Sequence, residues 1–136
     1  MTTTANDIEQ SALSILSAVA DRFGISLSEV GTGGGCMALE GRLESGHWIV
    51  AVDDGLCSLR TRLVYEAVAR DNGDSFPQGW SVGIYRNDPS ENTWMSYEDA
   101  VVDVVDYDAV GDALPEVIGR ALAMFVSSQL ATVTDR

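Results

Sequence analysis

Lysine is absent from this chain of 136 residues, histidine occurs once and cysteine twice. The missing lysine excludes a Walker phosphate-binding loop, which needs Gly-x-x-x-x-Gly-Lys-Ser/Thr. Two thiols are too few for a disulfide scaffold, and no apolar run approaches the ~20 residues of a membrane span. The first ten residues, MTTTANDIEQ, hold no basic residue, so we expect no secretory signal. The sequence therefore predicts a cytoplasmic protein.

Negative charge dominates the composition. There are 21 acidic residues against eight arginines, which gives a net charge of −13. This charge repels nucleic acid and anionic membranes, so neither is expected as a direct ligand. From Asn87 to Gly119 there are nine acidic residues and no basic one. Such a run is usual for a solvated face, and it also suits docking of a partner with a basic surface.

The first helix is expected over residues 7 to 23. Asn6 and Glu9 have the spacing of a capping box, and Gly24 supplies a left-handed stop. The apolar residues between them fall on one stripe of a 3.6-residue period, with polar residues outside it. We therefore expect one face of this helix to pack against a core.

A period of two follows the first helix and predicts three strands, near residues 27 to 30, 36 to 43 and 47 to 53. The tight turns between them are Glu44–Gly46 and, after the third strand, Asp53–Gly55. In WIVAV both alternating sets of side chains are apolar, which indicates a central strand covered on both faces. These segments form a meander.

The second half of the chain adds one ambiguous element and three clearer ones. Residues 59 to 70 suit either a helix or a strand, and we prefer a helix. Strands are expected near 80 to 86 and 99 to 107, and a last helix runs from near Asp112 to Gln129 with Pro115 in its first turn. This order predicts one α+β domain over residues 1 to 136, an antiparallel meander with the N- and C-terminal helices packed on one face.

The glycine run GTGGGCMAL, Gly31 to Leu39, is a poor phosphate site. A dinucleotide fingerprint needs glycine where Cys36 stands, and it follows a strand and opens a helix, whereas this run precedes a strand. We interpret it as a flexible or positive-φ connection that turns the chain back into the sheet.

Cys36, His47 and Cys57 are the candidate nucleophile and metal-ligating side chains. In the predicted hairpin His47 lies opposite Leu43, which leaves Cys36 roughly 24 Å away at ~3.4 Å per residue. This distance argues against a cysteine–histidine dyad and against a zinc site. The two thiols, on strands that flank a central one, are ~9.6 Å apart and outside disulfide range. We interpret both as small buried side chains.

The paired carboxylates do not form a recognisable site either. Asp53 and Asp54 belong to a turn, and the cluster Asp103, Asp106 and Asp108 lacks the ligand pattern and the glycine of a calcium loop. The sequence therefore predicts no catalytic residue, no cofactor and no metal, and we expect the protein not to be an enzyme.

The best candidate for a contact with another protein is a tryptophan in a loop. Trp48 and Trp80 occur in strand patterns and are expected in a core, whereas Trp94 lies in ENTWMSY. A loop tryptophan beside other large side chains and rimmed by acids has the composition of an interface anchor. The predicted contact residues are Glu91, Trp94, Met95, Tyr97, Glu98 and Asp99.

Three motifs resemble a phage family. GGGCMAL, WIVAVDDG and GWSVGIY, between Gly33 and Tyr85, resemble small acidic proteins of unassigned function from mycobacteriophages and related actinobacterial phages. The resemblance agrees with an arginine-only set of basic residues, which is typical of a GC-rich genome. It implies a phage accessory protein in the host cytoplasm that acts on host machinery, and it supplies no catalytic residues.

A second resemblance lies in the order of elements. Type III secretion chaperones are small and acidic and are ordered helix, three strands, helix, two strands, helix; the family binds extended polypeptide as dimers. Here the similarity depends on the helix near residues 59 to 70.

We favour a non-enzymatic interaction module that binds a host or phage protein with a basic surface. The alternatives are a DNA mimic that blocks a nucleic-acid-binding protein, a secretion-chaperone-like polypeptide binder and, last, a small enzyme that uses a cysteine or a carboxylate. A homodimer also stays open. Its surface would include Ile49 and Ala51 if the monomer leaves them uncovered.

Overall fold

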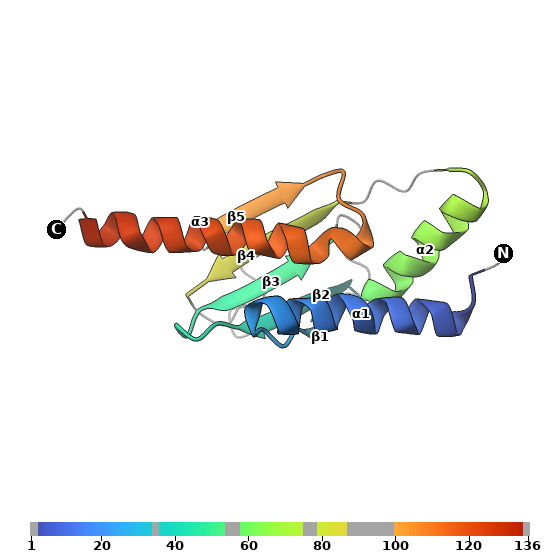
Figure 1. Cartoon of the computed structure of the whole chain (residues 1–136), viewed down its shortest axis with the longest axis horizontal. Helices are drawn as coiled ribbons and strands as arrows, with labels where there is room; N and C mark the ends of the chain where they lie inside the picture. Colours follow the sequence, from blue (N-terminus) through green and yellow to red (C-terminus); the bar gives the residue numbers. More distant parts are fainter. Residues whose placement is uncertain (1–2, 34–35, 54–57, 75–78, 87–99, 135–136) are drawn as a thin grey trace.

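The computed structural model describes residues 3–33, 36–53, 58–74, 79–86 and 100–134 (Figure 1). Within these residues a sheet lies against helices, as the sequence predicts for an α+β domain. The elements in chain order are α1 (Ala5–Phe23), β1 (Ser28–Gly33), β2 (Cys36–Arg42), β3 (Trp48–Val52), α2 (Leu59–Asp71), β4 (Trp80–Tyr85), β5 (Ala100–Asp106), the 3₁₀ turn η3 (Gly111–Ala113) and α3 (Leu114–Thr134).

The five strands follow one another across the sheet in the order β1-β2-β3-β4-β5, and every neighbouring pair is antiparallel. The meander is therefore confirmed, with β3 at its centre. The Glu44–Gly46 turn closes the β2–β3 hairpin, because the Leu43 amide donates to the His47 carbonyl at 2.8 Å and Gly46 has a φ of 93°. The predicted turn after Asp53 falls largely outside the described residues.

The core lies between one face of the sheet and the helices α1 and α3. Side chains from α1 (Ile15, Val19), from β3 (Ile49) and from α3 (Leu114, Ile118) all belong to one buried cluster. Ile49 and Ala51 are covered within the monomer. They therefore cannot supply the dimer surface that was considered for them.

The two strand tryptophans differ in their surroundings. Trp80 is buried in the core, as expected. Trp48 is only half-buried, because it lies on the opposite face of the sheet from Ile49, where the Arg42 guanidinium is 5.3 Å from its ring. The same face holds Val50, which is buried, and Val52, which is half-buried, so this side of β3 is covered in part and the other side is buried.

The capping box of α1 lies two residues earlier than predicted. Thr4 is the N-cap; its hydroxyl accepts from the Asp7 amide at 3.1 Å, and the Asp7 carboxylate accepts from the Thr4 amide at 3.0 Å. Asn6 and Glu9 therefore do not form the box, since a threonine and an aspartate with the same three-residue spacing precede them. Gly24 ends the helix in the left-handed conformation, as expected.

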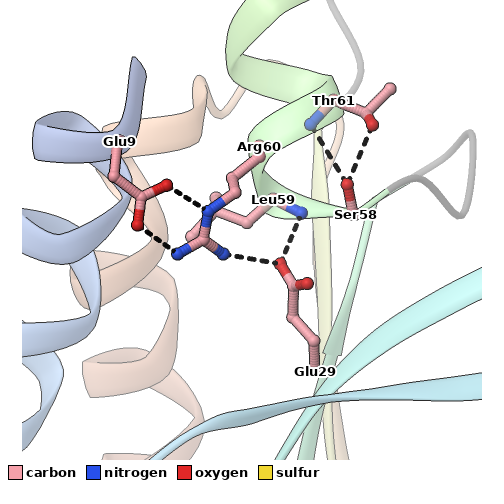
Figure 2. Close-up of polar contacts among 6 residues, drawn as sticks. All are labelled: Glu9, Glu29, Ser58, Leu59, Arg60 and Thr61. Atoms are coloured by element: carbon pink, nitrogen blue, oxygen red, sulfur yellow. Dashed lines mark hydrogen bonds and ion pairs between the residues drawn. The ribbon is translucent and has the colours of Figure 1, made fainter. Parts of the chain in front are cut away.

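The segment 59–71 is a helix, α2, which resolves the ambiguity of the sequence. Ser58 caps it, its hydroxyl accepting from the Thr61 amide at 3.1 Å. Arg60 ties α2 to α1, since its guanidinium donates two hydrogen bonds to Glu9, at 2.6 and 2.8 Å (Figure 2). Glu29 of β1 accepts from the Leu59 amide at 3.1 Å. These contacts fix the start of α2 against α1 and β1.

Glu9 gives a pH-dependent contribution to this attachment. The hydrogen bonds from Arg60 lower the pKa of the Glu9 carboxyl below its ordinary value of 4.5. A carboxyl with a lower pKa in the folded chain stabilises the fold above its unfolded pKa, and this contribution is lost as the pH falls through the folded pKa. We expect Glu9→Gln to lower the melting temperature at pH 7, and to lower it less near about pH 3.

Thermal unfolding of both proteins at the two pH values checks this expectation. Glu44→Gln, in the exposed β2–β3 turn, removes the same charge at a side chain that forms no ion pair with any described residue. An equal loss at pH 7 and at the acidic pH would contradict the assigned role of the Glu9–Arg60 pair.

The glycine run is partly strand rather than connection. Gly31 and Gly33 belong to β1, where Gly31 pairs with Met37 and Gly33 with Cys36 across a register shift. Gly31 is not among the glycines with positive φ. The positive-φ interpretation is therefore wrong for Gly31, because an extended conformation continues the β1–β2 ladder there; Gly34 and Gly35 lie outside the described residues.

The last helix is longer than predicted. It follows η3 directly, carries Pro115 in its first turn and continues to Thr134, five residues past the expected end. Phe125 is the last side chain of α3 in the buried cluster, and its ring contacts that of His47 edge-on at 4.8 Å. Beyond this contact α3 runs past the sheet at the left of Figure 1. Among the described helices, none has the length and apolar character needed to cross a membrane.

Candidate functional site

The contact residues predicted from the sequence lie outside the described part of the chain. This applies to Glu91, Trp94, Met95, Tyr97, Glu98 and Asp99, all within 87–99. The interface around Trp94 therefore stays a prediction.

Cys36 and His47 are separated as the hairpin predicts. Cys36 begins β2, whereas His47 follows the turn at the other end of that strand, and Leu43 pairs with it. The His47 ring bonds the Ser45 hydroxyl at 2.9 Å and contacts Phe125. These contacts give His47 a packing role at the end of the hairpin. Cys57 lies outside the described residues.

The acidic cluster on β5 does not converge on one point. One oxygen of Asp106 accepts from the Asp108 amide at 3.0 Å and the other from Arg120 at 2.6 Å, and these bonds lower the pKa of the Asp106 carboxyl. Asp103 lies on the sheet opposite Gly83, where partial burial raises the pKa of its carboxyl. Among the described residues, no group of three or more histidines, cysteines, aspartates or glutamates is placed to hold a metal ion.

One concave feature of the described surface is a cleft between α1, α2 and η3. Its volume is about 580 Å³, which lies within the range of small-ligand sites. We refer to it as the α1/α2 cleft. It is lined by Thr3, Ile8, Gln10, Ser11, Ser14 and Ile15 from the start of the chain, by Leu63, Glu66, Arg70 and Asp74 from α2 and its end, and by Val110 and Asp112.

The wall of the cleft is held by Glu66. One of its oxygens accepts from the Gly111 amide at 2.8 Å and from the Arg62 guanidinium at 3.3 Å, and the other oxygen lies 3.0 Å from the same amide. Glu66 is part-buried, with 13% of its side chain exposed. Its carboxylate thus joins α2 to η3 and remains at the cleft surface.

Arg62 supports Glu66 from inside the protein. It is fully buried and donates to the backbone carbonyls of Gly79 and Ala109, the second at 2.5 Å. Its guanidinium also lies 4.3 Å from the centre of the Trp80 ring, and the Trp80 indole donates to the Val110 carbonyl at 3.0 Å. The clamp formed by Arg62, Glu66 and Trp80 therefore fixes the segment 109–111 that borders the cleft.

The lining of the cleft is amphipathic and acidic. Ile8, Ile15 and Leu63 supply apolar surface. The ionisable side chains of the lining are three carboxylates and one guanidinium: Glu66, Asp74, Asp112 and Arg70. Arg70 also donates to the Thr3 hydroxyl at 3.5 Å. This lining suits a side chain with an aliphatic stem and a cationic head, which is the chemistry of arginine and lysine.

Sequence reasoning missed this site. The apolar residues of the segment, Leu59, Leu63, Ala67 and Val68, have helical spacing, yet Val68 is exposed and the buried side of α2 includes Arg62. The one available signal was the four-residue spacing of Arg62 and Glu66, which is typical of a helical ion pair. That spacing occurs equally on solvated helix faces, so it did not mark a buried pair.

On α2 and on α3 several large apolar side chains are exposed. On α2 these are Val64, Tyr65 and Val68, and on α3 they are Met124, Val126 and Leu130. Uncovered apolar side chains on neighbouring turns of a helix are a common feature of protein-binding surfaces.

A scan against protein-family models and searches of curated proteins and of solved structures found no match to this chain.

Proposed function

We propose that this protein is a non-enzymatic interaction module that binds a basic segment of another protein at the α1/α2 cleft. The observation that carries the proposal is the cleft itself: an amphipathic hollow with three carboxylates and one guanidinium in its lining. An arginine or lysine of the partner would place its stem on Leu63 and its cation near Glu66. Charge-assisted bonds to a carboxylate are stronger than neutral ones in such a part-buried setting.

The net charge of −13 supports the same partner. A strongly negative protein attracts a positively charged surface over a distance, which accelerates association and makes it sensitive to salt. The phage setting and the host partner that the sequence resemblance implies are consistent with this proposal, and they remain part of it. No catalytic role is assigned to any residue.

Filling the cleft should abolish binding. We expect Ser14→Arg, on the α1 side of the cleft, to place a competing cation and its stem inside the hollow. The matched control is Ser17→Arg, which adds the same side chain on the same helix but outside the cleft lining. Both positions are exposed, so both variants should fold.

The measurement is affinity capture from an actinobacterial lysate with the wild-type protein and the two variants, followed by mass spectrometry. We expect a basic protein that the wild type and Ser17→Arg retain and that Ser14→Arg loses by at least about tenfold, with release at high salt. Equal retention by all three proteins would remove the cleft from the proposal. A retained partner that is acidic would remove the charge argument.

A second candidate is a chaperone-like binder of extended polypeptide. It is favoured by the observed order of elements, α-βββ-α-ββ-α, which includes the helix at 59–71 on which that resemblance depends. The two candidates differ in what they bind. A chaperone-like protein should retain its partner only while the bound segment is extended, whereas the cleft proposal requires a single basic side chain that a folded surface can present.

A further inference from the structure

The side of α3 that faces α1 continues past the end of α1. A methyl group placed on Gly119 would lie 3.3 Å from the ring of Phe23, so this side of α3 packs against the last residue of α1. Ala123, Val126 and Leu130 follow Gly119 by four, seven and eleven residues, which places them on the same side of the helix. We call these three residues the α3 stripe.

The side chains of the α3 stripe are exposed to solvent. Ala123 is exposed, and Val126 and Leu130 are 55% and 62% exposed. The reason is geometric: α1 ends at Phe23 and the chain turns into β1, while α3 continues to Thr134. Figure 1 shows this part of α3 extending beyond both α1 and the sheet.

The described side chains of α3 after Phe125, those of residues 126–130, are exposed or half-buried. Isolated helices of fewer than ~12 residues are marginal in water, because most helical stability in proteins comes from packing of an apolar face. Phe125 is the last side chain of α3 in the buried cluster. The helix nevertheless continues for nine residues after Phe125, with apolar side chains on the stripe. Packing of the stripe against another helix would bury these apolar side chains and stabilise this end of α3.

The absence of charge in this segment favours a second copy of the chain as the partner of the α3 stripe. No charged residue occurs from Ala121 to Thr134, although the chain as a whole has a net charge of −13. A basic partner would select a surface with carboxylates, and this segment has none. Two copies of the chain repel each other wherever their acids meet, so a contact between copies is favoured where charge is absent.

We propose that the α3 stripe pairs with the α3 stripe of a second copy in an antiparallel, two-fold symmetric homodimer. In this arrangement Val126 of one protomer packs against Leu130 of the partner subunit, and the reverse contact is identical. The small side chain of Ala123 allows the two helices to approach closely. This proposal does not involve the α1/α2 cleft, whose lining contains none of the residues of the α3 stripe.

The dimer should be weak and should respond to salt in a distinctive way. Pairing over about three helical turns buries less than the ~1,200 Å² of a standard interface, so we expect reversible association in the micromolar range. Added salt screens the repulsion between two negative protomers and should tighten the dimer. Salt should weaken the complex with a basic partner, so the two proposals predict opposite effects.

Sedimentation velocity of the full chain from about 1 µM to 1 mM, at low and at high salt, tests the proposal. We expect a monomer–dimer equilibrium that tightens with salt. The double variant Val126→Glu/Leu130→Glu should weaken it at least tenfold, while Val64→Glu/Val68→Glu, on the exposed side of α2, should leave it unchanged. Near-UV circular dichroism establishes that both variants fold.

Three outcomes would overturn the proposal. They are a wild type that remains monomeric over the whole concentration range, a dimer that survives in the α3 variant, and a dimer that only the α2 variant abolishes. None of these results bears on capture of a basic partner, which Ser14→Arg tests separately.

Discussion

Replacing Arg62 by alanine is expected to lower the free energy of unfolding by about 3–5 kcal/mol. The guanidinium is fully buried and serves three acceptors: the carbonyls of Gly79 and Ala109 and the carboxylate of Glu66. Its removal leaves these acceptors without their donor and opens a cavity beside Trp80. Because natural domains are stable by only ~5–15 kcal/mol, this single change should remove a large part of the total.

Urea unfolding of Arg62→Ala measures this loss as a lower midpoint. Arg60→Ala is the matched control. Arg60 also lies on α2 and also bonds carboxylates, but its side chain is 39% exposed. Exposed ion pairs contribute ~0–1 kcal/mol, so Arg60→Ala should be far milder. Arg62→Lys should not restore stability, because a lysine ammonium lacks the planar set of donors and the stacking surface. Similar losses for Arg60→Ala and Arg62→Ala would contradict the assigned clamp.

Replacing Gly79 by alanine is expected to cost about 2–5 kcal/mol. Gly79 has a φ of +67°, where an L-residue is strained by ~1–2 kcal/mol. Its added Cβ would also lie 2.5 Å from the Asp106 carbonyl oxygen and 2.7 Å from the Tyr107 Cα. Both are backbone atoms and cannot rotate away, so overpacking adds ~1–3 kcal/mol.

Gly24→Ala separates the cost of the positive φ from the cost of the steric clash. Gly24 has nearly the same φ, +68°, but nothing lies within 4 Å of a Cβ there. It should therefore show the conformational strain alone, and the difference between the two variants measures the steric clash. Equal destabilisation at both positions would mean that the backbone of Asp106 and Tyr107 shifts easily next to Gly79.

The effects of Arg62 and Gly79 should not add. The Gly79 carbonyl accepts from Arg62, so a shift of this backbone that relieves the clash also moves the acceptor away from the guanidinium. Residues in one network commonly couple by ~0.5–3 kcal/mol. We expect the double variant to lose less than the sum of the single losses.

Much of the fold followed from local patterns. The periods of 3.6 and two residues, Gly24, the Glu44–Gly46 turn and Pro115 predicted the α+β meander with its terminal helices, because each is a local preference of the backbone or of one apolar face. The errors were local as well. The cap of α1 was placed at Asn6, since two overlapping pairs had the spacing of a capping box, and only the packed helix selects between them.

The candidate site could not be predicted from local patterns. The α1/α2 cleft brings together residues that are far apart in the chain, such as Ser14, Glu66 and Asp112. No local pattern predicts that these residues lie close together in space. The same holds for Arg62. The sequence pattern predicts an ordinary polar residue of a helix, and only the fold places the carbonyls of Gly79 and Ala109 next to its guanidinium.

By itself, the sequence determined the class of fold, the order of its elements and the negative charge, because these depend on residue type and on spacing along the chain. Only the tertiary structure decided that Ile49 and Ala51 are covered, that Arg62 is a buried clamp and that Val126 and Leu130 are left uncovered. Burial depends on which elements come to lie against each other, and on where one helix ends while its neighbour continues.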